Sequence, residues 1–155
     1  MKRWNGLWAS MAVVAACAAS APALAHDDAY LDTLTAPHGG QLRMAGPQHL
    51  ELVLVKDSAQ AKDNPVMVYV TDHAGTPAST QGATGTVTLL MGKTKVSAPL
   101  QPDGDNRLKA TAHYASLPGI KAVVSIKLAG QDVQQARFTP LAPKPAASMP
   151  MDHAH

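Results

Sequence analysis

Residues 107–114 read RLKATAHY, a stretch in which apolar and polar side chains alternate without a break. The apolar set is Leu108, Ala110, Ala112 and Tyr114. Successive side chains of a β-strand point to opposite faces, whereas an amphipathic helix needs apolar residues at every third or fourth position. The stretch therefore predicts a strand that buries one face and exposes the other.

The same period of two recurs along the middle of the chain. The further runs are HLELVLVK at 49–56, VMVYVTD at 66–72, GTVTLLM at 85–91, AVVSIKL at 122–128 and DVQQARF at 132–138. Turn-forming pairs such as Gly39-Gly40 and Gly46-Pro47 lie between strands. Seven or eight short strands with no long helical pattern predict an all-β fold, a sandwich or a barrel. We expect an antiparallel, immunoglobulin-like β-sandwich over residues 37–140, after a lead segment at 26–36.

The first 25 residues have the features of a secretory signal peptide. Lys2 and Arg3 precede an apolar stretch at 7–19, and ALA at 23–25 matches a small-residue cleavage site. The apolar stretch is shorter than the roughly 20 residues of a membrane span. We expect export to the periplasm and a mature chain that begins at His26. VAAC at 14–17 supports an alternative, in which an acylated Cys17 anchors the protein to a membrane.

Composition excludes several classes of protein once the signal is removed. Cys17 leaves with it, so the mature chain has no disulfide and no thiolate chemistry. Lys2 and Arg3 leave too, so the mature chain has as many basic residues as acidic ones, 11 of each. The chain also lacks the cluster of basic residues that would indicate nucleic-acid binding. The chain has no Gly-x-Ser-x-Gly, His-Glu-x-x-His or phosphate-loop motif, so we expect no enzyme activity.

Methionine and histidine gather at the carboxyl end, in SMPMDHAH at 148–155. The potential ligands are Met149, Met151, His153 and His155. Thioethers favour Cu(I), and imidazoles suit copper and zinc. The donors predict copper, as Cu(I) or Cu(II), with zinc as a second candidate; chance enrichment in a tail is the alternative. Residues 141–155 are rich in Pro and Ala and predict a flexible tail. Ordering seven such residues costs roughly 7–14 kcal/mol, so the tail suits a labile capture arm.

A tighter site needs ligands that the fold holds in place, and APHGGQLRMAGPQHLEL at 36–52 supplies His38, Met44 and His49. If two strands pair as a hairpin about AGP at 45–47, His38 and His49 lie toward the same end. The structural alternative is that His38 caps the Gly-Gly turn and His49 is exposed at a strand start.

His26 is a further candidate, because cleavage after Ala25 would make it the amino terminus. Its α-amine, of a type with a pKa near 7.7–8.0, and its ring nitrogen would form a chelating pair. Acylation at Cys17 would abolish this chelate. His73 and His113 are interpreted as surface histidines.

Three segments carry a resemblance to known proteins: PHGGQLRMAGPQHLELVL at 37–54, VMVYVTDHAG at 66–75 and ARFTP at 136–140. They resemble small exported β-domains encoded with heavy-metal efflux systems, and stretches of the periplasmic adaptors of metal-exporting pumps. The resemblance implies an all-β periplasmic module that handles copper or a related metal, with His38 and His49 as carried-over residues. The chain lacks the helical hairpin of a pump adaptor.

A weaker resemblance links His26 to periplasmic copper-resistance sandwiches that bind Cu(II) through an amino-terminal histidine. Those proteins also use an Asp-x-His, whereas here TDH at 71–73 and MDH at 151–153 place the two residues next to each other. The expected function is metal buffering or transfer to an efflux adaptor or another metallochaperone. The alternative is an interaction module that docks on an efflux or envelope assembly without binding metal.

Overall fold

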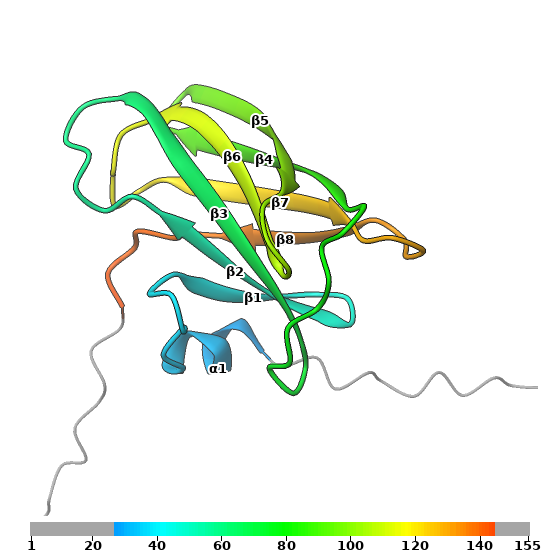
Figure 1. The fold of residues 1–155 in the computed structure, drawn as a ribbon. Helices are drawn as coiled ribbons and strands as arrows, with labels where there is room; N and C mark the ends of the chain where they lie inside the picture. Colours follow the sequence, from blue (N-terminus) through cyan, green and yellow to red (C-terminus); the bar gives the residue numbers. More distant parts are fainter. Residues whose placement is uncertain (1–26, 145–155) are drawn as a thin grey trace, which may run out of the picture.

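The computed structural model describes residues 27–144, which form one short helix and eight strands (Figure 1). The elements in chain order are α1 (Asp28–Thr33), β1 (Gln41–Ala45), β2 (Gln48–Leu54), β3 (Lys62–Asp72), β4 (Thr84–Met91), β5 (Thr94–Pro102), β6 (Arg107–Tyr114), β7 (Lys121–Lys127) and β8 (Gln134–Phe138). The predicted all-β, antiparallel fold is confirmed. The helix in this part of the chain is too short to cross a membrane.

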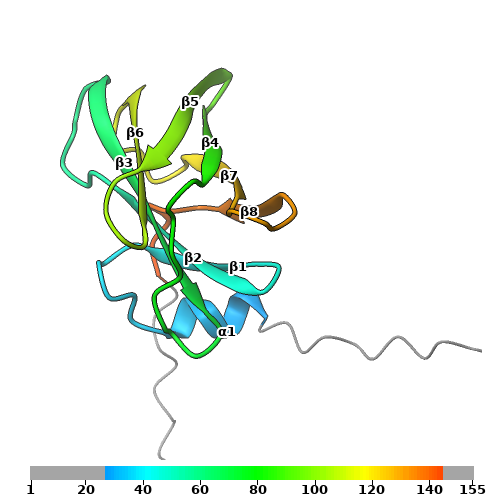
Figure 2. The same ribbon diagram turned by 45° about the vertical axis from the view of Figure 1, so that its right-hand side comes forward.

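The eight strands form one sheet in the order β1-β2-β3-β6-β5-β4-β7-β8, and every strand pair is antiparallel. The sheet curls until its two end strands, β1 and β8, lie next to each other (Figures 1 and 2). Side chains bridge this seam: the Thr139 backbone N–H donates to Gln41 Oε1 at 2.8 Å. The arrangement is therefore closer to a nearly closed barrel than to two separate sheets.

The interior is filled by the alternate residues that the period of two predicts. Val66, Val68 and Val70 of β3 are fully buried, and they face Leu50 and Leu52 of β2 in register. Each fully buried aliphatic side chain stabilises the fold by about 1.5–3 kcal/mol. The protein thus builds its core from Val, Leu, Ile and Ala, with Tyr114 and Phe138 as its buried aromatic residues in the described range.

Tyr114, the last apolar residue of RLKATAHY, links β6 to β3 and to the end of β2 through its hydroxyl group. The hydroxyl donates to the Pro65 carbonyl at 2.7 Å and accepts from the Val55 N–H at 3.0 Å. Burial raises the pKa of this phenol above its usual value. The side chain therefore adds a polar tie at the wall of the core as well as apolar burial.

Helix α1 lies in the lead segment, where no helix was predicted. The Asp27 carboxylate caps it by accepting from the Ala29 N–H at 3.1 Å, and Leu31 is buried against the barrel. Arg43 of β1 holds the helix through a bidentate pair with Asp32, at 2.8 and 3.2 Å. The Arg43 hydrogen bond lowers the pKa of the Asp32 carboxyl below its usual value.

Candidate metal centre

Two histidines from different parts of the chain stack on the outer side of the barrel. The His49 ring of β2 and the His73 ring, which follows β3, have centroids 5.1 Å apart and planes inclined by 23°. His49 is buried, whereas His73 is exposed. The register of β1 and β2 sets Met44 directly opposite His49, and opposite residues on one face have Cβ atoms about 4.5–5.5 Å apart. Two imidazoles and a thioether therefore share one surface.

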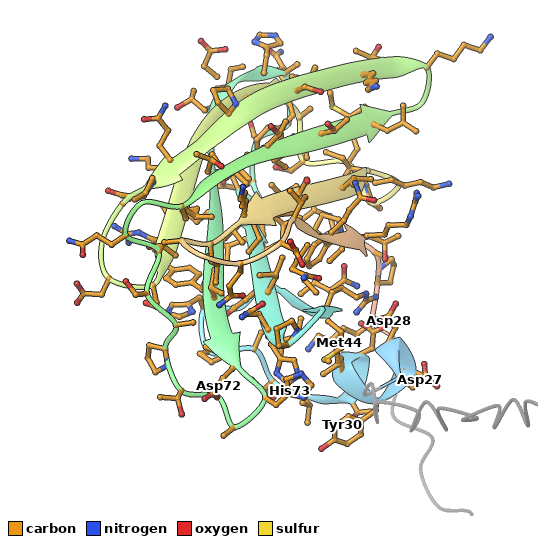
Figure 3. All side chains as sticks on the ribbon, turned by 90° about the vertical axis from the view of Figure 1, so that its right-hand side faces the viewer. Asp27, Asp28, Tyr30, Met44, Asp72 and His73 are labelled. Carbon is orange, nitrogen blue, oxygen red and sulfur yellow. The ribbon has the colours of Figure 1, made fainter. Side chains whose placement is uncertain are left out.

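Figure 3 shows Met44 and His73 at the end of the molecule where α1 lies. Asp27 and Asp28 lie at the same end of the molecule as Met44 (Figure 3). The described chain begins at Asp27, at this end of the molecule. His26 itself lies outside the described residues.

The turn after β3 fixes the position of His73. The Asp72 carboxylate oxygen Oδ1 accepts from the Ala74 and Thr76 N–H groups, each at 2.8 Å, and the Asp72 N–H donates to the Thr76 carbonyl at 2.8 Å. The Thr76 and Ala74 N–H groups lower the pKa of Asp72 below its usual value. Gly75 adopts the left-handed conformation, with φ +82°, that closes the turn. His73 is thus held on a turn that stays formed while Asp72 is ionised.

This donor set is suited to a soft or borderline metal ion. In residues 27–144 no group of three or more His, Cys, Asp and Glu side chains is placed to hold a metal. A third protein ligand beside His49 and His73 would therefore be the Met44 thioether, which favours Cu(I). The His73 Nε2 atom is 3.4 Å from the Gly46 carbonyl oxygen. A ring that donates from Nε2 keeps its Nδ1 lone pair for a metal.

His38 has a different set of partners, centred on Glu51. The His38 backbone N–H donates to Glu51 Oε1 at 2.8 Å, His38 Nδ1 contacts Oε2 at 2.8 Å, and the Gly40 N–H donates to Oε1 at 3.0 Å. The His38 ring also lies flat on Tyr69, with centroids 3.5 Å apart and planes inclined by 2°. Glu51 is buried, and it ties the Gly-Gly turn to β2.

The Glu51 contact determines which His38 nitrogen could bind a ligand. An ionised carboxylate only accepts hydrogen bonds, so Nδ1 of the neutral ring carries the proton and Nε2 keeps the lone pair. Histidines that bind metals almost always donate their other N–H to a carboxylate, a carbonyl or water. The His38 side chain is 43% exposed. Its Nε2 atom could therefore bind a metal, but only together with ligands from elsewhere.

The structure places the predicted ligands in two groups. His49 and Met44 occupy the same surface. His38, which precedes β1, contacts Glu51, two positions from His49 along β2. The predicted hairpin about residues 45–47 is present, with Ala45 opposite Gln48. Five of the predicted ligands lie outside the described residues, namely His26, Met149, Met151, His153 and His155.

Neither the contact of His73 with His49 nor that of Glu51 with His38 was predicted from the sequence. The sequence contains a signal for the second, because Glu51 is the one acidic residue in the apolar run at 50–55 and lies two positions from His49. His73 carries no such signal, since it follows the strand and its partner comes from β2. His113 contacts Asp63 at 3.0 Å, and both are exposed.

Comparisons of the chain with protein-family models, with curated proteins and with solved structures found no significant match.

Proposed function

We propose that this chain is an exported, non-enzymatic protein that binds copper and buffers it or passes it on in the periplasm. The observation that carries the proposal is the stacking of His49 on His73, with Met44 opposite His49. Two imidazoles and one thioether form a three-donor set that suits copper better than a hard ion such as Mg²⁺ or Ca²⁺. Zinc, which also accepts imidazole ligands, is the competing cargo.

The exposure of the two rings supports transfer rather than permanent storage. His49 is held in the wall of the barrel, while His73 lies on an exposed turn. Rotation of the exposed ring would open or complete the coordination of an ion without disturbing the core. We assign His49 and Met44 the fixed half of the site and His73 the exchangeable half, with His26 as an additional chelating group in the cleaved protein.

His38 and the carboxyl-terminal residues fit an accessory role in this proposal. Lys144, the last described residue, donates from Nζ to the Leu34 carbonyl at 3.4 Å, so the chain continues from a point close to the lead segment that precedes His38. Four residues separate Lys144 from Met149 in the sequence, and an extended chain spans about 3.3–3.6 Å per residue. In this proposal, metal caught by the methionine and histidine donors at 149–155 is passed to His38 Nε2, which would add a further imidazole ligand.

Titration of the mature protein with Cu(I), Cu(II) and Zn(II) against a competing chelator tests the proposal. His73→Ala and Met44→Leu should each weaken Cu(I) binding at least tenfold, because each removes one donor while leaving the core intact. His113→Ala is the matched control, since His113 is an exposed histidine beside a carboxylate and lies away from the site. Equal affinities for all three variants, or negligible binding by the unaltered protein, would contradict the proposal and favour an interaction module without metal.

Deletion of residues 148–155 tests the accessory role separately. The deletion should lower the metal stoichiometry or the rate of uptake, and it should leave the thermal stability of the metal-free domain unchanged. Uptake at the same rate and in the same amount would show that these residues take no part.

A further inference from the structure

Charge is unevenly distributed between the two halves of the barrel. Strands β5, β4, β7 and β8 contain no Asp or Glu, and they carry the basic residues Lys95, Lys121, Lys127 and Arg137. Among residues 27–144, none of these four side chains forms an ion pair. In contrast, β2 and β3 carry Glu51, Asp63 and Asp72. One half of the barrel is therefore positively charged although the whole mature chain is close to neutral.

The basic residues face outward because of the same period of two that fills the core. In β4 and β7, Val87, Leu89, Ala122 and Val124 are buried. The alternate positions Thr88, Leu90, Lys121 and Val123 point away from the core, and the register aligns Leu90 with both Lys95 and Lys121. Leu90 is exposed at the middle of this row. The outer face thus combines cations and hydroxyl groups with one exposed apolar side chain.

This face is concave. A groove of about 720 Å³ lies on it, and its lining includes Lys95, Leu90, Lys121 and Arg137 together with Arg43 and Asp28. Arg43 is occupied by Asp32 and by Asp28, whose Oδ2 atom is 3.5 Å from Arg43 Nε. Lys95, Lys121 and Arg137 remain as three cations around Leu90. A groove with this lining is complementary to an extended chain that carries carboxylates on both sides of an apolar residue.

We propose that this groove is a docking site for an acidic segment of a partner protein. Three observations favour such a segment over an anionic membrane: the surface is concave, its lining combines the three cations with the apolar residues Leu90, Val123 and Phe138, and the acidic Asp28 also lines it. Association would be steered by charge and weakened by salt, because the three side chains are exposed and screening at 0.15 M salt acts over about 8 Å. Asp28 also lies at the same end of the molecule as Met44 (Figure 3), so a docked segment would extend toward the candidate metal centre. The docking proposal does not depend on metal binding.

The test uses the mature protein and a fluorescein-labelled twelve-residue peptide of Glu and Asp with a central Leu, followed by anisotropy at low and at physiological salt. The triple variant Lys95→Glu, Lys121→Glu and Arg137→Glu should bind the peptide at least tenfold more weakly than the unaltered protein. The control is Lys62→Glu with Lys109→Glu, which reverses two exposed cations on the β3–β6 side of the barrel and should change binding less than twofold. Circular dichroism verifies that both variants keep the β-fold.

Three outcomes would overturn the proposal. The first is no measurable binding of the peptide at low salt. The second is an equal loss in the triple variant and in the control, which would show attraction by overall charge alone. The third is binding to phosphatidylglycerol vesicles that the triple variant abolishes while peptide binding is negligible, which would make the face a membrane-binding surface.

Discussion

Glu51 is the residue on which the Gly-Gly turn depends. It receives two backbone N–H groups and the His38 ring nitrogen on a carboxylate that is almost completely shielded from water. A change at a buried acceptor that serves three donors destabilises the fold, because the donors lose their partner and are too buried to bond to water instead. The turn and the orientation of His38 therefore share one determinant.

Glu51→Gln should lower the free energy of unfolding by about 1–3 kcal/mol, since an amide has one oxygen and its NH₂ group would face N–H donors. Urea unfolding followed by circular dichroism measures this. Asp63→Asn is the matched control: it alters a carboxylate that also contacts a histidine Nδ1, but both side chains are exposed. Equal midpoints for the two variants would contradict the role assigned to Glu51.

Asp72 leads to a prediction with a defined pH range. Because the Thr76 and Ala74 N–H groups lower its pKa, the turn is stabilised above the ordinary value of 3.8 and loses this support only as the pH falls through the lower, folded value. The amide NMR signals of Ala74 and Thr76 should therefore titrate with a midpoint below pH 3.8. Asp72→Asn should abolish that titration. A midpoint at or above 3.8 would mean that the carboxylate does not hold the turn.

Residue identity alone predicted part of the candidate site. His49 and Met44 could be placed on neighbouring strands because the AGP turn fixes the hairpin register. His73 was interpreted as a surface histidine, and it is exposed, but its ring lies against His49 because β2 and β3 pair. The pairing of β2 with β3 joins residues far apart in the sequence, so the local pattern around His73 could not predict its contact with His49.

At the scale of elements, α1 is the main feature that the pattern did not predict. A six-residue helix offers one turn and a half, too little for an apolar period to be recognised. Its stability comes from tertiary contacts, namely the burial of Leu31 and the pairing of Arg43 with Asp32. The strands, in contrast, were predictable because each buries one face over five or more residues.

Leu31→Ala should destabilise the protein by about 2–5 kcal/mol, the usual cost of truncating a buried leucine. Leu117→Ala provides a control at an exposed leucine and should leave the urea midpoint nearly unchanged. A lower urea midpoint for Leu31→Ala than for Leu117→Ala would show that the lead segment is part of the folded unit. If the two variants unfold at the same urea concentration, α1 contributes nothing to the stability of the barrel.

For the whole molecule, the all-β antiparallel class followed from periodicity, but the closure of the sheet did not. A sandwich and a barrel present the same alternation, and they differ in how the outer strands meet. Here β5 joins β6 through only two register pairs, while β1 and β8 meet through side chains such as Gln41. These long-range contacts decide between a sandwich and a barrel. They also bring the candidate metal centre and the basic groove to neighbouring parts of the surface.

The central claim is that Met44, His49 and His73 bind one copper ion together. The most direct measurement is an NMR titration of the mature protein with Cu(I), which is diamagnetic and leaves the signals observable. The Met44 methyl signal and the ring signals of His49 and His73 should shift together and reach saturation at one equivalent, while those of His113 stay in place. Saturation without any shift of His49, His73 and Met44, or shifts spread equally over all histidines, would contradict the claim.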